Sequence, residues 1–355
     1  MHVPLTHEPL GTYFGALCPD KTPGFAWSIL DGSGRKSDGW GGRAVVDPEI
    51  VPVEEGTLFD LASLTKPLAT ALLALQAEDR GELDLDSPVP GTAGLPFTCL
   101  QVLRHEAGFP AWVPLYAFAR DREGAKRWLL ESCPRGVPGE KTEYSCPGYI
   151  LLGFILEELL HGSIDRLFAD RVASPLGVRP EEACFAPPAV LRRRTAATER
   201  GSFHEATMAR QFGALPPFVE PSGWGQVNDG NARFLGGAAG NAGLFATLGG
   251  VERLVSALRP SAGFLSGRAL DRAWRPSAGF RTAGWKAAGY PGWAAGAVLP
   301  PGSVGHEGFT GTGVWMEPGE GMSYILLTNR IHPRHPGTDF GEARAAFLKA
   351  AGGTS

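Results

Sequence analysis

Short apolar blocks near both ends of this 355-residue chain have the alternation and the flanking turn residues of β-strands. Residues 25–30 run into the turn Asp31-Gly32-Ser33-Gly34, and residues 39–46 supply a return strand. Near the other end, strands are predicted at 294–299, 303–308, 313–317 and 322–328. We therefore expect an antiparallel sheet to which both ends of the chain contribute.

Helical spacing of apolar residues dominates the middle of the chain. Helices are predicted at 63–79, 98–106, 117–132, 149–160, 164–173 and around 250–258, with a last one at 341–351. Arg80-Gly81 closes the first of them, as C-cap residues commonly do. Regular patterning fades over 179–231, where we expect loop with short helices.

This order of elements predicts an α/β (α+β) fold, in which an antiparallel sheet is flanked by helices and carries an inserted all-helical region. Residues 1–62 and 235–355 would form one α/β domain built from both termini. Residues 63–234 would form the mainly helical region. The active site would lie between the two.

The helix predicted from residue 63 opens with Ser63 and Lys66, a spacing that places both side chains on one face of a helix. Serine becomes a good nucleophile when a neighbouring base removes its proton, and a lysine shielded from water can lose its charge and act as that base. A second S-x-x-K pair, Ser33 and Lys36, lies in a Gly-rich polar turn, where both side chains would be solvated. Only the Ser63 pair has the apolar surroundings that burial requires.

Composition and charge narrow the classes of function that remain. The net charge of −4 argues against nucleic-acid binding, and the five scattered cysteines and eight histidines show neither C-x-x-C nor H-x-x-x-H spacing. We expect no metal, no cofactor and a monomer. The chain as given shows no signal peptide and no apolar stretch long enough to span a membrane, which predicts a cytoplasmic protein; only a start upstream of Met1 would add an export signal.

Three motifs occur along the chain in this order: Ser63-x-x-Lys66, Tyr144-Ser145-Cys146 and His306-Glu307-Gly308. Together they resemble the β-lactamase/penicillin-binding serine hydrolases, above all the class C-like branch with its Y-x-N motif and an H-x-G variant of K-T-G. Residues 103–110 are similar to the "LLxHTSGLP" stretch of that family. Residues 225–245 and 325–330 resemble its Gly-rich segment and its last core strand.

The resemblance implies a role for each matching position. Ser63 would be the acylated nucleophile, and Lys66 and Tyr144 would share the general-base and general-acid work, in an order that the sequence leaves open. The backbone N–H groups of Ser63 and Phe309 would form the oxyanion hole. Gly308 would let the substrate lie close along the edge strand.

Two positions depart from the family pattern. Cys146 stands where the Y-x-N motif has asparagine, and a thiol is a poor hydrogen-bonding partner for a substrate amide. His306 stands where K-T-G has its carboxylate-binding lysine, and Glu307 replaces the threonine. If the charged form of His306 holds an anionic substrate, KM should worsen as pH rises through neutrality.

These substitutions favour a serine hydrolase that forms an acyl-enzyme with a small ester or amide. A β-lactamase or D-alanyl-D-alanine carboxypeptidase is the alternative within the enzymes. A non-catalytic protein that binds β-lactam-like or peptide-like ligands is the alternative of another class. The expected partner in each case is a small molecule.

Overall fold

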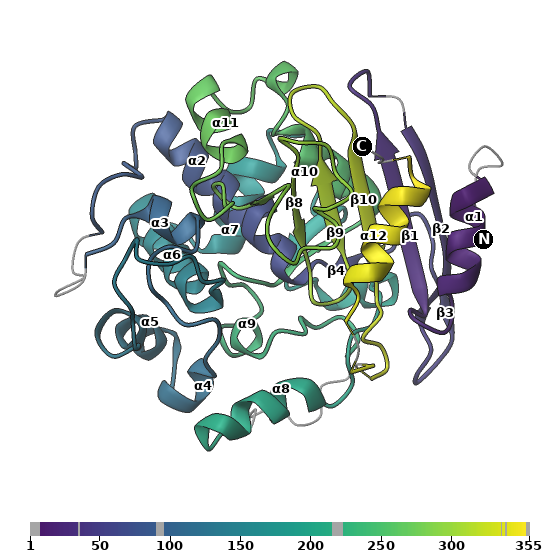
Figure 1. Ribbon diagram of the computed structural model, residues 1–355. Coiled ribbons are helices and arrows are strands. Elements are labelled where there is room, and N and C mark those ends of the chain that lie inside the picture. The colour runs from purple at the N-terminus through teal and green to yellow at the C-terminus, as the bar shows by residue number, and fades with distance from the viewer. Residues whose placement is uncertain are drawn as a thin grey trace.

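Two antiparallel sheets organise the computed structural model, which describes residues 8–34, 36–89, 96–214, 223–334, 336–337 and 339–352 (Figure 1). The larger sheet has the order β3-β2-β1-β10-β9-β8-β7, and the smaller has the order β4-β6-β5. The strands are β1 (Gly24–Leu30), β2 (Lys36–Val45), β3 (Val51–Pro52), β4 (Phe59–Asp60), β5 (Ala183–Phe185), β6 (Leu244–Ala246), β7 (Lys286–Ala287), β8 (Val304–Glu307), β9 (Gly313–Met316) and β10 (Ser323–Thr328).

Helices fill the rest of the described chain. The α-helices are α1 (Glu8–Leu17), α2 (Leu72–Asp79), α3 (Cys99–Leu103), α4 (Leu115–Phe118), α5 (Arg122–Glu131), α6 (Cys146–Leu160), α7 (Ile164–Phe168), α8 (Phe203–Ala209), α9 (Gly230–Phe234), α10 (Leu248–Ser256), α11 (Gly267–Trp274) and α12 (Gly341–Ala350). Shorter 3₁₀ segments are η1 (Ala62–Leu64), η4 (Ala189–Arg194), η5 (Arg210–Phe212) and η6 (Pro260–Ala262), and η2 (Lys66–Ala71) and η3 (Ala169–Ala173) have π-helical bonding. Among the described residues, no helix has the length and apolarity needed to cross a membrane.

The centre of the large sheet pairs the two ends of the chain. Trp27 of β1 lies opposite Gly39 on one side and opposite Leu326 of β10 on the other. The side chain of Asn329 strengthens this junction, because its Oδ1 accepts from Gly24 N at 2.9 Å while its Nδ2 donates to Ala44 O at 2.9 Å. Both termini therefore contribute to one sheet, as the alternating pattern predicts.

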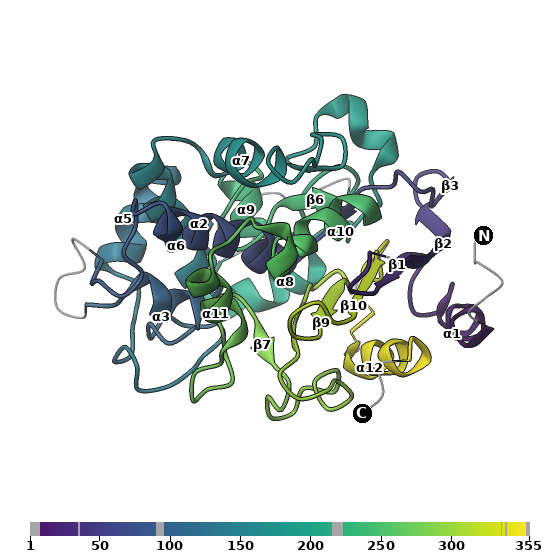
Figure 2. The ribbon, with the colours of Figure 1, turned by 90° about the horizontal axis from the view of Figure 1, so that it is seen from above.

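The two faces of the large sheet are covered by different parts of the chain (Figures 1 and 2). Helices α1 and α12 contact each other and lie on one face, over a core that contains Trp27, Trp315 and Tyr324. Helix α10 packs against β1 and β10 on the other face, where the main core continues into the helical part of the chain.

The α/β (α+β) fold class expected from the sequence is confirmed, and so are the strands at the centre of the sheet. The strand predicted at 294–299 is wrong. That segment forms turns, with Ala297 N donating to Trp293 O at 3.1 Å, because Ala295 and Leu299 turn inward to the core beneath α1 and α12. The division of the chain at residues 62 and 235 stays a prediction.

The sequence analysis also assigned no element to residues 8–17 and none to 267–274, where α1 and α11 form. Leu10, Phe14 and Leu17 are buried at the i, i+4, i+7 spacing of a helix. The sequence therefore contains the apolar pattern of α1, but the pattern is too short to stand out. The single helix predicted over 63–79 is instead three consecutive segments, η1, η2 and α2. Pro67 near the start of η2 has no N–H to donate, so regular α-helical bonding cannot run through it.

The stacking of α1 on the sheet should contribute to stability without touching the site. Phe14 is fully buried, and its ring stacks on that of Phe25 with centroids 3.9 Å apart. We expect Phe14→Ala to lower the free energy of unfolding by about 3–5 kcal/mol, as measured by urea titration. The kinetics of the folded variant should match the wild type, because the sheet separates Phe14 from Ser63.

Tyr13→Phe is the matched control. It removes only the hydroxyl that donates to Ala343 O at 2.9 Å, so it should cost about 1 kcal/mol. An unfolding free energy unchanged in Phe14→Ala would show that α1 is dispensable for the sheet.

Candidate active site

Ser63 lies in η1, shortly after β4, the edge strand of the smaller sheet. The backbone turn just before Ser63 is strained. Ala62 adopts a φ of 47°, in the left-handed region that residues with a Cβ avoid. The Asp60 carboxylate holds this turn, since its Oδ1 accepts from Ala62 N at 2.8 Å and its Oδ2 from Asn228 N at 2.7 Å. Burial raises the pKa of Asp60 to about 6. The turn leaves Ser63 half-buried, at the wall of a cavity.

The side chains of Lys66 and Tyr144 meet at the Ser63 hydroxyl. Lys66 Nζ donates to Ser63 Oγ at 3.0 Å, and Tyr144 Oη donates to the same oxygen at 2.7 Å. The S-x-x-K spacing accounts for the first contact, whereas the second joins positions 81 residues apart. The three residues that the sequence singled out for catalysis are therefore in direct contact.

Lys66 is completely buried, and its ammonium group is surrounded by acceptors. Besides Ser63 Oγ it contacts Asn241 O at 3.1 Å and Cys146 Sγ at 3.6 Å. Burial lowers the pKa of Lys66, but the charges of Cys146 and Tyr144 oppose it, and the net pKa is raised. Burial by itself favours loss of the Lys66 proton, as the sequence analysis expected, whereas the groups around the ammonium favour the charged form.

Tyr144 precedes α6 in a segment that His105 holds in place. His105 Nδ1 accepts from Ser145 N at 3.0 Å, His105 O accepts from Glu143 N at 2.9 Å, and its ring lies 4.7 Å from that of Tyr144. Burial lowers the pKa of His105 well below its usual value, which suits the neutral acceptor that Ser145 N requires. The sequence gives His105, within the stretch 103–110, a capping or packing role rather than a catalytic one, and these contacts fit it. Burial also raises the pKa of the Tyr144 phenol.

The loop after β8 is attached to the strand that leads to Ser63. Thr310 Oγ1 donates to Asp60 O at 2.7 Å, and Thr312 Oγ1 donates to Leu61 O at 3.2 Å. A Cβ on Gly308 would lie 2.5 Å from Leu61 O, so only glycine allows this approach. The loop brings Phe309 into the wall of the same cavity as Ser63, as a two-donor oxyanion hole requires.

Two cavities meet at Ser63, Tyr144, His204 and Phe309. The larger, of about 650 Å³, is lined by several cationic side chains: Arg281, Lys286, Arg330 and Arg344. The smaller, of about 170 Å³, is lined by acidic and apolar ones: Glu199, Glu205, Asp229, Trp112 and Met208. The larger cavity also has Glu307 and Asp339 in its wall, so its cationic side chains outnumber its acidic ones, whereas neither lysine nor arginine of the described chain lines the smaller cavity.

Cys146 and His306 take different positions around this centre. Cys146 begins α6 beside Lys66, and it lines the smaller cavity. His306 lines the larger cavity, with its ring 6.2 Å from that of Tyr144. Burial, aided by the nearby charges of Lys66 and Lys286, holds the pKa of His306 well below its usual range. A neutral His306 cannot supply the positive charge that the sequence analysis considered for it.

The sequence analysis missed several residues that surround the site. Asp60 was visible three positions before Ser63 but had no motif to mark it. Asn241 lies in the stretch 225–245 that resembles the family but was not singled out, and Arg281 carried no signal, because it reaches the site only through the fold. From the sequence, Asp229 and Asn231 could either line the cleft or stabilise a loop. Asp229 caps α9 by accepting from Ala232 N at 2.8 Å and also lines the smaller cavity, and Asn231 Oδ1 accepts from Leu115 N at 2.8 Å.

The second S-x-x-K pair lies apart from this centre. Ser33 is exposed, its hydroxyl donates to Asp31 Oδ1 at 2.6 Å, and Lys36 pairs with Asp38 at 3.4 Å and with Glu252 at 3.5 Å. Its surroundings are thus polar, as the sequence indicated.

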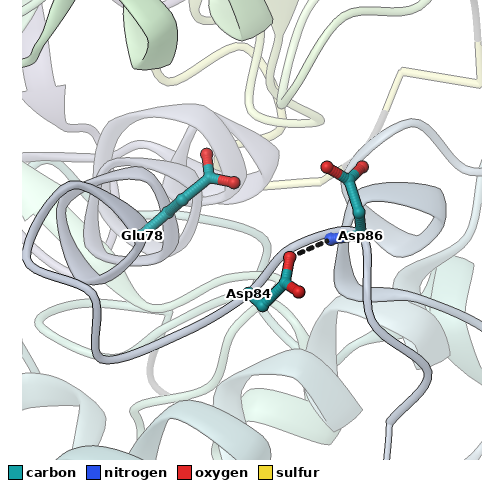
Figure 3. Close-up of side chains that lie close together, drawn as sticks. All are labelled: Glu78, Asp84 and Asp86. Atoms are coloured by element: carbon teal, nitrogen blue, oxygen red, sulfur yellow. Dashed lines mark hydrogen bonds between the residues drawn. The ribbon is translucent and has the colours of Figure 1, made fainter.

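Three carboxylates outside the site, those of Glu78, Asp84 and Asp86, also lie close together (Figure 3). Arg272 contacts both Glu78 and Asp86, the latter at 2.6 Å, so arginine already balances this group. Asp84 accepts from Asp86 N at 3.0 Å. Each of the three carboxylates thus has a partner within the chain.

An antiparallel sheet with helices on both faces, and a serine that contacts a buried lysine and a tyrosine at its margin, define the class of β-lactamase-like serine hydrolases. A family model described as Beta-lactamase matches residues 18–347. The chain belongs to this family of serine hydrolases, which act on small ester, amide or β-lactam-type substrates.

Relatives within the family differ in activity. The chain is 27% identical over 339 residues to a putative D-alanyl-D-alanine carboxypeptidase of Escherichia coli, covering 85% of this chain and 74% of the relative. A solved hydrolase with promiscuous acyltransferase activity superposes with a TM-score of 0.75 at 19% identity, over 96% of this chain and 97% of the other. A class C β-lactamase from Rhodobacter sphaeroides gives 0.70 at 22% identity, over 96% and 97%. At 19% and 22% identity, these two solved structures establish the fold of this chain and not its activity.

The neutrality of His306 can be tested directly. Its folded-state pKa lies below the usual value near ~6.5, so the Cε1–H resonance of His306, assigned with His306→Gln, should not shift between pH 8 and pH 6.5. Because the unfolded chain binds the proton first, the contribution of His306 to stability should be present above pH ~6.5 and lost as pH falls. A midpoint at or above pH 6.5 would show that His306 is charged in the folded enzyme.

Proposed function

We propose that this protein is a hydrolase in which Ser63 forms an acyl-enzyme with a small ester or amide. The observation that carries the proposal is the pair of contacts at Ser63 Oγ, 3.0 Å from Lys66 Nζ and 2.7 Å from Tyr144 Oη. A serine positioned by two proton carriers, at the meeting point of two cavities, is suited to nucleophilic catalysis. No other serine in the described chain combines these contacts.

Acylation begins when the Lys66–Tyr144 pair has lost one proton. The pair then accepts the Ser63 proton while Oγ attacks the substrate carbonyl carbon. The N–H groups of Ser63 and Phe309 stabilise the oxyanion that results. When the carbon–leaving-group bond breaks, the same pair returns the proton to the departing alcohol or amine.

Deacylation repeats these steps with water as the nucleophile. Water gives a proton to the Lys66–Tyr144 pair and attacks the acyl carbon. Collapse of the second tetrahedral intermediate breaks the bond to Ser63 Oγ, which recovers its proton from the pair. The products are a carboxylic acid and the alcohol or amine released earlier, so the pair ends in its starting state.

Cys146 favours an ester over an amide as the substrate. Its Sγ lies against Lys66 Nζ at 3.6 Å and lines the smaller cavity, where a carboxamide could bind a substrate amide more strongly than a thiol. A solved carboxylesterase of family VIII superposes with a TM-score of 0.71, which supports an esterase on this fold. Hydrolysis of β-lactams or of D-alanyl peptides is the alternative, and a binding protein without turnover is the remaining one.

Labelling by a fluorophosphonate tests the nucleophile. The wild type should gain the mass of the phosphonyl group at Ser63, with fluoride as the leaving group, and Ser63→Ala should lose both the label and the hydrolysis of short-chain aryl esters. Ser33→Ala is the matched control, because it belongs to the exposed S-x-x-K pair, and it should behave as the wild type. Labelling without turnover of any ester would support the binding protein, and labelling that survives in Ser63→Ala would refute the proposal.

The raised pKa values of Lys66 and Tyr144 predict how the rate depends on pH. The base forms only when the pair loses a proton, so kcat/KM for a neutral ester should rise from pH 7 to above pH 9.

Tyr144→Phe should lower the acylation rate by about 10²–10⁴-fold, the usual contribution of a positioned acid–base group. Stopped-flow acylation across this range measures both effects, and wild-type rates in Tyr144→Phe would exclude a shared proton transfer.

A further inference from the structure

Four aromatic side chains form a continuous row that begins at the wall of the smaller cavity. Trp112 lines that cavity. The centre of its ring lies 5.9 Å from that of Phe212, and the ring of Phe212 lies 6.2 Å from that of Phe118, both in edge-to-face arrangements. Phe118 in turn stacks on Trp128, with centroids 4.6 Å apart. We call these four side chains the aromatic strip.

Two parts of the chain pack side by side to form the aromatic strip. Three of its rings come from residues 112–128, and Phe212 comes from η5. This short helix continues α8, which lies close to α4 at the lower margin of the ribbon (Figure 1). Met208 of α8 lines the smaller cavity, and Phe212 follows it by four positions, so one face of this helical segment runs from the cavity onto the strip. At the far end, Phe118 and Trp128 line a further cavity of about 410 Å³.

The middle of the aromatic strip is open to water. Phe118 is 41% exposed and Phe212 is 42% exposed. Exposed aromatic surface is stabilised when an apolar group covers it, and ring contacts add to the gain from burial. Apolar surface that is continuous with a ligand cavity is therefore a candidate binding surface for the same ligand.

The smaller cavity can hold only part of a long apolar chain. Its volume is about 170 Å³, and since a cavity of about 150 Å³ holds one benzene molecule, about six carbons would fill it. The surface that it exposes is mainly apolar, and its carboxylates each accept from a backbone N–H: Glu199, Glu205 and Asp229. A longer chain on a substrate at Ser63 would extend beyond this cavity, and the strip is the apolar surface that continues from it.

We propose that the aromatic strip binds an apolar chain of the substrate and makes this hydrolase selective for esters with a chain of more than about six carbons. The proposal rests on the proposed function, since it assumes that the substrate reacts at Ser63. The substrate is the occupant because Trp112 belongs both to the strip and to the cavity whose wall contains the reacting hydroxyl. Phe118 and Phe212 are in this sense specificity-determining residues, which contact the chain rather than the reacting carbonyl.

Two pairs of neutral esters test the selectivity, each at concentrations below those at which the esters aggregate. Phenyl hexanoate and phenyl decanoate differ only in the acyl chain, whereas hexyl acetate and decyl acetate differ only in the alcohol. The reactivity of the carbonyl hardly changes within a pair, so the ratio of the two kcat/KM values reports the added methylenes. A fully buried methylene is worth about fourfold, so partial burial on the strip should favour the longer ester by at least about tenfold in one pair. That pair identifies the side of the substrate that lies on the strip.

Phe118→Ser and Phe212→Ser should each lower this ratio by about threefold, and the double variant should bring it below about three. Phe280→Ser is the matched control, because Phe280 is also 41% exposed but precedes Arg281 at the larger cavity, and it should keep the wild-type ratio. Each ratio is taken within one variant, so a loss of folded protein cancels. A ratio near one in both pairs for the wild type, or a wild-type ratio in the double variant, would overturn the proposal.

Thermal unfolding measures binding of the chain without turnover. Octanamide should raise the Tm of Ser63→Ala more than hexanamide does at the same concentration, since the tighter ligand stabilises the folded protein more. This difference should vanish when Phe118→Ser and Phe212→Ser are added, and a difference that persists there would overturn the proposal. If Ser63 takes no fluorophosphonate label but octanamide keeps its advantage, the proposed function alone is refuted. Intact labelling with equal shifts for the two amides would refute the strip alone.

Discussion

The buried ammonium group of Lys66 is the interaction on which the rest of the site depends. A charge removed from water must be met by acceptors, and the chain supplies Ser63 Oγ, Asn241 O and Cys146 Sγ from three separate elements. Satisfying Lys66 thus brings together the segments before α2, at the start of α6 and before β6. The same contacts place the serine hydroxyl where a proton can leave it.

The neighbourhood of Ser63 is rigid because its supports converge on a few backbone atoms. Asp60 holds the left-handed turn at Ala62 from one side, and Thr310 and Thr312 attach the loop after β8 to the same strand. Arg344 then fixes the carbonyl of Gly308 in that loop. Strain at a single residue is tolerated where so many bonds determine its conformation, and here they set the distance between Ser63 and the proposed oxyanion donors.

Charge is distributed unevenly around this rigid centre. Burial raises the pKa of Glu205, in the smaller cavity, to about 7, while the larger cavity contains the Arg281 guanidinium, whose Nε and Nη1 make no hydrogen bond in the described chain. Such groups reduce the stability of the unliganded fold, since each would be better solvated in the unfolded chain. Because these groups lie beside Ser63, a bound substrate can offset the stability that they cost. The same groups therefore bear on which substrate is chosen.

The sequence by itself determined what depends on near neighbours along the chain. The three-residue spacing made Ser63 and Lys66 adjacent, the apolar surroundings distinguished them from Ser33 and Lys36, and alternation located β1 and β10. The order of three motifs indicated the family that the comparisons establish. The tertiary structure alone decided the acceptors around Lys66, the burial of His306, the approach of Arg281 and the turns at 294–299. Periodicity records which face of an element is apolar, whereas a pKa and a contact between distant residues depend on everything that packing brings near, and no local pattern contains that information.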